Sequence, residues 1–431
     1  MSLIDTTSTA REDSDIRRSV LPGGLRVVTE HRSGTHGVHV GWFVGVGSRH
    51  ETARQHGCSH VLEHVLFKGT RRRDAAEVSA AVERVGGDLN AWTGRDHTAF
   101  HARVLRRDLP LALDVLGDML TDSVLREADL ASEKEVILDE IAMHRDDPLE
   151  LTQELVHGSL FGTDPLARPV IGTEASITAL SRNQVRSFWR RHYRTARSVI
   201  SVVGDVDHDR VVDQVAQLRV PEGEPLTREP AVLVQQAGEV RHHWTRLAQT
   251  SVSLGFPGFA RDDERRFALS VLTTALGGGM SSRLFQRVRE QRALAYAIDS
   301  SDSTWRGAGL ASIDWQALPG RTASIVDEVR GIVTDVVEHG ITEDELQAAI
   351  TLIEGQTRLA LDSGSTSMTR LGLTWLSDDL RSVDDVLQGY RQVTRDAVTD
   401  VARQVLGNRP HLALAGGRTP LRAVERVLDR W

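Results

Sequence analysis

The stretch His60-Val61-Leu62-Glu63-His64 carries the strongest signal in this chain. It lies in a pattern of apolar residues at helical spacing that runs from residue 59 to residue 67. Residues four apart lie on one face of a helix, so the two imidazoles can reach a single ion while the glutamate stands beside them. Zinc favours imidazole nitrogen and carboxylate oxygen, and a catalytic zinc site leaves one position to water. The stretch therefore predicts a zinc site in which Glu63 removes a proton from that water.

Two other pairs of histidines are also four residues apart. His56 stands before a glycine and is expected to lie outside the helix. His97 and His101 fall in a strand pattern, where four residues span about 13 Å, which is too far for two side chains to share one ion. The predicted metal ligands are therefore His60 and His64.

A helical pattern at residues 129–144 offers carboxylates for a third ligand. Glu133 and Glu140 lie two helical turns apart on one face, next to apolar positions, whereas Glu135 and Asp139 point more outward. One of the first pair is expected to bind the metal and the other to orient a ligand. A solvated acidic helix face is the alternative, and the spacing alone leaves it open.

The first half of the chain predicts an α+β unit. Apolar periodicity and glycine breakers predict strands at 25–30, 38–46, 88–93, 98–105 and 199–203, and helices at 59–67, 75–85, 109–120 and 129–144. A stretch rich in Pro, Glu and Gly at 218–239 reads as a linker. We therefore expect an N-terminal domain at 1–217 that carries the metal site.

The second half repeats this order of elements. It predicts strands at 250–255, 295–299, 309–316 and 412–415, and helices at 264–275, 282–290, 320–339 and 342–361. In both halves two long helices follow a strand pair, and a last apolar strand ends in glycine. The pattern indicates an internal duplication, with a homologous C-terminal domain at 240–431.

Composition limits the partners and the compartment. A chain of 431 residues exceeds what one hydrophobic core usually organises, which predicts at least two domains. A net charge of -8 gives no broad basic surface, so nucleic acid is not an expected partner. The single cysteine, Cys58, excludes intramolecular disulfides and a cysteine-cluster metal site, which fits a reducing cytosol.

The N-terminal residues and the apolar runs of the chain indicate no export and no membrane span. Residues 1–14 are polar and acidic, unlike a signal or transit peptide. No run approaches the roughly 20 apolar residues that cross a bilayer. We therefore expect a cytoplasmic protein.

The run Gly57-Cys58-Ser59-His60-Val61-Leu62-Glu63-His64, followed by Phe67-Lys68-Gly69-Thr70, resembles the pitrilysin/insulinase family of inverted-motif zinc peptidases. The resemblance covers nearly the whole chain. It implies two homologous domains of the LuxS/MPP-like metallohydrolase type, each a mainly antiparallel sheet covered by helices. It also implies one zinc ion per chain, with Glu140 as the third ligand and Glu133 as a carboxylate that orients a ligand.

Two further segments resemble the family's substrate-binding parts. Gly86-Gly87-Asp88-Leu89-Asn90-Ala91-Trp92-Thr93 is similar to its active-site edge strand, which implies substrate contacts at Asn90 and Ala91. Ser282-Arg283-Leu284-Phe285, with Arg289 and Tyr296 downstream, is similar to its Arg/Tyr signature. The resemblance implies that Arg289 and Tyr296 hold the substrate carbonyl.

The family resemblance implies a function and a partner. The chain is similar to the mitochondrial-processing-peptidase-like, bacterial two-domain branch, which implies a zinc endopeptidase for unfolded peptides or extended protein segments. Its partner is then an identical chain that completes an enclosing dimer, or a homologous subunit. Alternatives are a non-catalytic scaffold subunit and a zinc hydrolase for non-peptide substrates. Cys58 is expected to be a buried small residue, and its closeness to the metal leaves a redox role open.

Overall fold

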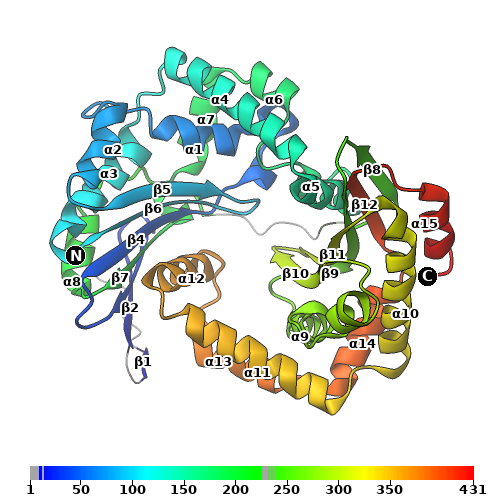
Figure 1. Ribbon diagram of the computed structural model, residues 1–431. Helices are drawn as coiled ribbons and strands as arrows, with labels where there is room; N and C mark the ends of the chain where they lie inside the picture. Colours follow the sequence, from blue (N-terminus) through cyan, green and yellow to red (C-terminus); the bar gives the residue numbers. More distant parts are fainter. Residues whose placement is uncertain (1–8, 12–13, 226–231, 233, 236–237) are drawn as a thin grey trace. The chain divides into compact units, whose positions relative to one another are not determined.

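The computed structural model describes residues 9–11, 14–225, 232, 234–235 and 238–431 (Figure 1). The chain divides into two compact units, each of which contains one sheet. The first unit comprises Met1–Ile141, Pro169–Arg228 and Arg358–Arg381, and the second comprises Ala142–Arg168, Glu229–Thr357 and Ser382–Trp431. Most of residues 1–14, on which the expectation of no export rests, lies outside the described residues.

The first unit contains a seven-stranded sheet. Its strands lie in the order β1 (Thr9–Arg11), β2 (Ser14–Val20), β3 (Arg26–His31), β7 (Ser198–Gly204), β4 (Gly37–Val44), β6 (Thr98–Leu105) and β5 (Asp88–Thr93). Only β3 and β7 run parallel; the other described neighbours are antiparallel. The strand β5 is therefore an edge of this sheet.

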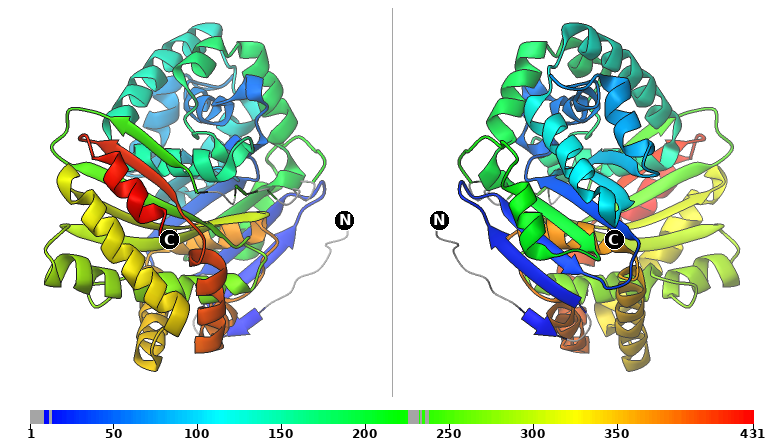
Figure 2. Two further views of the ribbon diagram at one scale, coloured as in Figure 1. Left: turned by 90° about the vertical axis from the view of Figure 1, so that its right-hand side faces the viewer. Right: turned by 90° about the vertical axis from the view of Figure 1, so that its left-hand side faces the viewer.

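Helices cover one face of this sheet, and the buried apolar residues between them form its main core. Figures 1 and 2 show these helices gathered on that side of the strands. They are α1 (Cys58–Leu66), α2 (Ala75–Glu83), α3 (Leu109–Asp122), α4 (Glu127–Asp146), α6 (Glu174–Ala179), α7 (Arg182–His192) and α8 (His208–Val215). Trp42 and Phe100 from the strands meet Leu62 of α1 and Leu116 of α3 in this core. Burial of such large apolar side chains is the main source of the unit's stability.

The second unit contains a five-stranded sheet. Its strands lie in the order β10 (Ala297–Trp305), β11 (Ala308–Ala317), β9 (Thr250–Gly258), β12 (His411–Gly416) and β8 (Val240–Trp244). Its helices are α9 (Arg265–Gly277), α10 (Thr322–His339), α11 (Glu343–Ala360), α13 (Val383–Arg391), α14 (Arg395–Leu406) and α15 (Leu421–Leu428). The predicted helix at 282–290 is a short π-helix, η6 (Phe285–Gln291).

The two sheets share one topology. The order β3-β7-β4-β6-β5 in the first sheet corresponds to β8-β12-β9-β11-β10 in the second. The single parallel pair occupies the same place in both, β3 with β7 and β8 with β12. The predicted fold class is therefore confirmed: two homologous domains, each a mainly antiparallel sheet covered by helices.

Each sheet also receives a helix from the other half of the sequence. Helix α5 (Pro148–Phe161) packs on β9 and β12, and α12 (Gly364–Leu376) packs on β4 and β7. Glycines permit the close approach: a Cβ added at Gly255 would lie 2.3 Å from Val156 of α5, and one at Gly41 would lie 2.6 Å from Met368 of α12. The two helices thus bury apolar faces on corresponding strands.

This exchange means that the compact units differ from the two halves of the sequence. One change of unit, after residue 228, falls inside the predicted linker 218–239, part of which lies outside the described residues. The segments 142–168 and 358–381 each belong to the unit of the opposite half. The division into 1–217 and 240–431 remains a prediction about the duplicated halves, whose local patterns do not reveal which sheet a helix covers.

Several connections between the helices and strands contain short 3-10 helices. Single turns of 3-10 helix lie at Ser48–His50, Ala53–Gln55, Arg106–Asp108, Pro165–Ala167, Thr195–Arg197 and Pro319–Arg321. Among the described residues, no helix combines the length and the apolar character needed to cross a bilayer.

A buried carboxyl in the second sheet makes stability depend on pH. Asp314 of β11 is 5% exposed, and Gln153 of α5 donates a hydrogen bond to its Oδ1 over 2.7 Å. Burial raises the pKa of Asp314 to about 6, from an ordinary value of about 4. Because the folded pKa is the higher one, this group favours folding most below pH 4, and the contribution is lost as the pH rises through 6.

We therefore expect Asp314→Asn to stabilise the protein at pH 7.5, by about 1–3 kcal/mol in the free energy of unfolding. The gain should shrink towards pH 4, where the wild-type carboxyl is already neutral. Denaturant unfolding at both pH values measures it. An equal difference at both would contradict the assignment.

Candidate metal centre

Helix α1 places the three residues of the sequence motif on its polar side. Its apolar side, with Val61, Leu62 and Val65, is buried in the core of the first unit. His60, Glu63 and His64 are consequently half-buried on the opposite side. The predicted helical face is observed, and the core packing fixes its direction.

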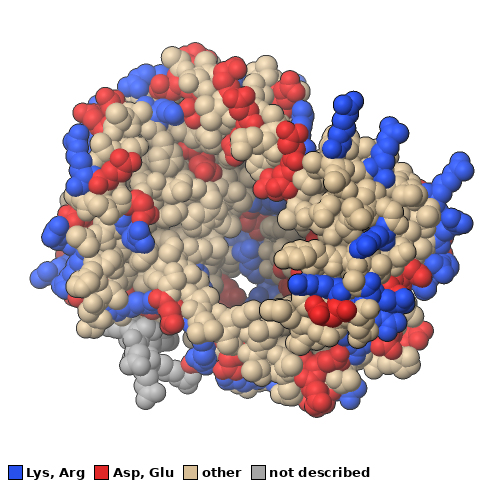
Figure 3. Space-filling view, in the orientation of Figure 1, with Lys and Arg blue, Asp and Glu red and all other residues tan. Residues whose placement is uncertain are grey.

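Helix α4 supplies the carboxylates. Ile137 and Ile141 are buried, and Glu133 and Glu140 lie on the same side of the helix, with Glu133 only 4% exposed. Glu135 and Asp139 are exposed. Figure 3 shows acidic side chains along the outer surface where Figure 1 draws α4. The acidic helix thus has two inward carboxylates as well as a solvated face.

Three side chains converge from these two helices. Glu140 Oε1 lies 3.7 Å from His60 Nε2, and Glu140 Oε2 lies 3.6 Å from His64 Nε2. One ligand atom from each of the three residues lies within 4.8 Å of the others. Donors at about 2.1 Å from a tetrahedral ion are about 3.4 Å apart, close to the distances found here. Two imidazole nitrogens and one carboxylate oxygen therefore fit a zinc-type ion in both chemistry and spacing.

Glu133 contacts the back of one imidazole. Its Oε2 lies 3.0 Å from His64 Nδ1, and Lys68 Nζ lies 2.6 Å from its Oε1. A carboxylate at Nδ1 holds the proton there, so that Nε2 presents its lone pair towards Glu140. The sequence alone did not indicate a role for Lys68, which lies in the run Phe67-Lys68-Gly69-Thr70.

We expect Glu133→Gln to weaken zinc binding about 10–100-fold, because the amide cannot both accept from His64 and pair with Lys68 as the carboxylate does. Competition with a chromogenic chelator measures the affinity. Glu135→Gln, an exposed change on the same helix, is the control and should keep wild-type affinity. Equal affinities for the two variants would contradict the role given to Glu133.

Glu63 lies beside the pair of histidines and the end of β5. The Thr93 hydroxyl donates a hydrogen bond to Glu63 Oε2. Burial raises the pKa of the Glu63 carboxyl, while the Thr93 hydrogen bond and the nearby His64 oppose that shift. The helix that carries the histidines is thereby joined directly to the edge strand, a contact for which the sequence had no local signal.

The strand β5 presents an open edge. Within the described part of the chain it pairs with β6 alone, with Asn90 opposite His101 and Ala91 opposite Phe100. Asn90 is exposed, and its Oδ1 accepts a hydrogen bond of 2.8 Å from the Ala91 N–H. A side chain thus satisfies a backbone donor at this edge, as expected where no further strand is present.

The predicted substrate residues Arg289 and Tyr296 belong to the second unit. Arg289 lies on the π-helix η6, with its guanidinium 4.5 Å from the centre of the Phe285 ring and 5.0 Å from that of Tyr296. Tyr296 is 79% exposed, so it is not a core tyrosine. Stacking on two rings orients the guanidinium, and π-helical turns recur at functional sites.

The remaining sequence candidates lie outside the cluster. His56 precedes α1, as predicted, and its Nε2 lies 3.0 Å from the Pro169 carbonyl oxygen. His101 lies on β6, also as predicted. Cys58 is buried, and burial raises the pKa of its thiol well above the usual range. The reactive thiolate is therefore disfavoured at neutral pH.

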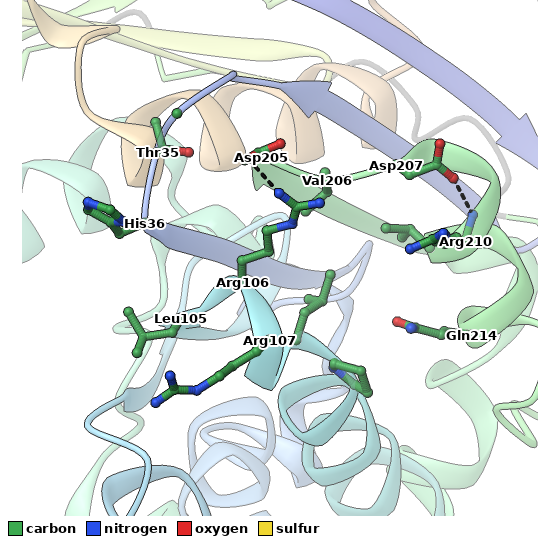
Figure 4. Close-up of a pocket in the computed structure, with 14 residues that line it drawn as sticks. Thr35, His36, Leu105, Arg106, Arg107, Asp205, Val206, Asp207, Arg210 and Gln214 are labelled. Atoms are coloured by element: carbon green, nitrogen blue, oxygen red, sulfur yellow. Dashed lines mark hydrogen bonds and ion pairs between the residues drawn. The ribbon is translucent and has the colours of Figure 1, made fainter.

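A cavity of about 680 Å³ elsewhere in the first unit shares no residue with this cluster (Figure 4). Two of its charged side chains pair with each other, Arg106 with Asp205 over 2.7 Å, and Asp207 accepts the backbone N–H of Arg210 over 2.9 Å. The candidate metal ligands lie on α1 and α4 instead.

Comparison with known proteins agrees with the geometry. A family model described as insulinase (peptidase family M16) matches residues 26–174, which include every residue of the metal cluster, and one described as peptidase M16 inactive domain matches residues 179–353. The chain is 43% identical to an uncharacterized zinc protease of Streptomyces coelicolor, over 93% of this chain and 89% of that one. It is 32% identical to an uncharacterized zinc protease of Bacillus subtilis, over 93% and 98%.

A solved structure shows the same fold. The crystal structure of a peptidase M16 inactive domain from Pseudomonas fluorescens superimposes with a TM-score of 0.87 and 21% identity, covering 94% of this chain and 98% of that one. The fold, the family models and the similar sequences agree with the motif that α1 carries. This chain belongs to peptidase family M16, the insulinase family.

Proposed function

We propose that this protein is a zinc-dependent endopeptidase that cleaves unfolded peptides or extended protein segments. The observation that carries the proposal is the convergence of His60, His64 and Glu140 beside Glu63, which is itself hydrogen-bonded to Thr93 at the end of an open strand. Family membership and relatives named zinc proteases support it.

The proposed mechanism assigns a different role to each side chain of the site. His60, His64 and Glu140 would hold one zinc ion, which supplies a polarised water and a Lewis acid for the peptide carbonyl. Glu63 accepts the proton of the attacking water and passes it to the leaving amine. Glu133 keeps the His64 ring oriented, with Lys68 balancing the charge of the carboxylate.

The edge strand sets the substrate class. An extended peptide adds to β5 through main-chain hydrogen bonds, at Ala91 by displacing the Asn90 oxygen from the N–H. Only a segment without its own secondary structure can pair in this way. Main-chain hydrogen bonds depend little on the identity of the substrate's side chains, so the specificity for peptide sequence is broad.

Arg289 and Tyr296 complete the proposal as donors to the substrate carbonyl. Arg289→Lys should lower kcat about 10²-fold and leave zinc affinity unchanged, because the ammonium keeps the charge but loses the planar donors and the ring stacking. Arg287→Lys is the control, since Arg287 shares the π-helix but pairs with Glu328 over 3.1 Å. A wild-type kcat in Arg289→Lys would remove Arg289 from the site.

We also propose a partner and a compartment for this protein. An enclosed homodimer, or a heterodimer with a homologous subunit, would admit unfolded peptides and exclude folded proteins. The proposed compartment is the cytoplasm. A non-catalytic scaffold is the second candidate, because the second family model is described as an inactive domain. The set of three candidate metal ligands in the first unit favours a catalytic function over a scaffold function.

Peptide cleavage tests the function. The wild-type protein, loaded with zinc, is incubated with a peptide of about 10–20 residues, long enough to lie along a strand edge, and the fragments are mapped by mass spectrometry. Cuts at internal bonds that stop with a chelator and return with zinc support the endopeptidase. Stepwise loss from one end would indicate an exopeptidase, and bound zinc without cleavage would favour the scaffold.

A further inference from the structure

A buried carboxylate outside the metal cluster holds the N-terminus of the metal-binding helix. Glu51 is 3% exposed, and it accepts the N–H of Gly57 over 2.7 Å and the N–H of Ser59 over 2.6 Å. The first N–H groups of a helix have no acceptor within the helix. Glu51 satisfies two of them at once in α1, and a negative charge there is also favoured by the helix dipole.

The helix has no capping side chain of its own. Its N-cap residue is Gly57, in the left-handed region at φ 86°, and a Cβ there would lie 2.5 Å from Ile177. A glycine is therefore required at this position, and it cannot supply the usual capping oxygen. The carboxylate from residue 51 takes that role from outside the helix.

The first turn of α1 matters for the metal because it contains a ligand. The helix has nine residues, and His60 is the third of them. Short helices owe their order to packing and caps rather than to internal hydrogen bonds. The place of the first turn therefore sets the distance between His60 and Glu140 on α4.

The segment that carries Glu51 is itself tied to the edge strand. The N–H groups of Ser48 and Arg49 donate to the carbonyls of Gly94 and Arg95, over 3.2 and 3.1 Å. Arg49 also pairs with Asp96 over 2.9 Å, with both side chains under a tenth exposed. Residues 94–97 form the turn between β5 and β6, so residues 47–51 connect the proposed peptide-binding edge to the metal helix.

We propose that Glu51 is a positioning residue for the metal centre, which holds the first turn of α1, and with it His60, in register with Glu140 and with β5. This rests on the proposed metal site and assigns a role to a residue outside it. Removing the charge of Glu51 should loosen the ligand geometry more than it unfolds the protein.

The test compares Glu51→Gln with Asp207→Asn, the same chemical change at the N-cap of α8, where Asp207 accepts the Arg210 N–H. Zinc affinity is measured by chelator competition at a temperature at which both apoproteins stay folded, and thermal unfolding of the apoproteins is measured alongside. We expect Glu51→Gln to weaken zinc binding about tenfold or more and Asp207→Asn to leave it unchanged. Zinc affinity within about twofold of wild type in Glu51→Gln, whatever its stability, would overturn the proposal.

A second variant covers the case in which Glu51→Gln does not fold. Asp96→Ala removes the oxygen that accepts the Arg49 hydrogen bond and leaves the residues of α1 unchanged; a severalfold weaker zinc affinity supports the proposal, and a wild-type affinity overturns it. The affinity measurement needs no cleavage. If the wild-type protein binds zinc but cleaves no peptide, the proposed endopeptidase function is contradicted and the test of Glu51 stays valid. If the wild-type protein binds no zinc, both proposals are contradicted.

Discussion

Glu63→Gln should retain zinc and lose about 10²–10⁴-fold in kcat on an unstructured peptide, because the amide has the size of the carboxylate but cannot accept the proton of the attacking water. Glu63 is not one of the three converging ligands, so its replacement leaves His60, His64 and Glu140 in place. The hydrogen bond from Thr93 can also be accepted by the amide oxygen. Binding of the metal is thereby separated from catalysis.

Two measurements on one sample settle this prediction. Zinc is quantified by atomic absorption, and kcat is measured with a quenched fluorescent peptide. Full zinc with a kcat close to wild type would exclude Glu63 as the base. A loss of zinc in parallel with activity would instead make Glu63 part of the ligand set, which contradicts the geometry.

Glu140→Ala should release the metal. Structural zinc sites bind with about 10–16 kcal/mol over four ligands, so one protein ligand contributes roughly 3–4 kcal/mol, or about 10²–10³-fold in affinity. The carboxylate of Glu140 spans both histidines, at 3.7 Å from His60 Nε2 and 3.6 Å from His64 Nε2. Its loss leaves two imidazoles, and peptide cleavage should fall with the zinc content.

The neighbouring residue provides a matched control. Asp139 precedes Glu140 on the same helix and is exposed. Asp139→Ala should keep wild-type zinc affinity and activity, which shows that helix α4 tolerates the loss of a carboxylate. Equal zinc affinity in both alanine variants would mean that the third ligand is not Glu140.

Several elements with a regular local pattern were predicted from the sequence with nearly correct bounds, whereas the strand predicted at 295–299 is observed at 297–305 and helices α14 and α15 were not predicted. The strand pair at 88–93 and 98–105 is observed at the predicted residues, and the ends of α1, α2 and α10 differ from the predicted ones by at most two residues. Alternation with a period of two and apolar recurrence with a period near 3.6 are properties of neighbouring residues, so a single sequence contains them. The helix at 282–290 was placed correctly but forms a π-helix, which has no such pattern.

The site was only partly accessible from the sequence. Spacing predicted His60 and His64 as metal ligands, but it left Glu133 and Glu140 as alternatives for the third, because both lie on one face of α4. Tertiary geometry distinguishes them: one carboxylate faces the Nε2 atoms, and the other lies at the Nδ1 of His64. Glu51 could not be found at all, since an acidic residue in a loop has no periodicity to mark it.

The sequence by itself therefore determined the metal motif, the duplicated order of strands and helices, and the family, because these features depend on the spacing between residues that are close together in the chain. Tertiary structure decided which sheet α5 and α12 cover, which carboxylate faces the histidines, and what holds the first turn of α1. Those outcomes depend on contacts between residues distant in the sequence, where shape and burial select the partner.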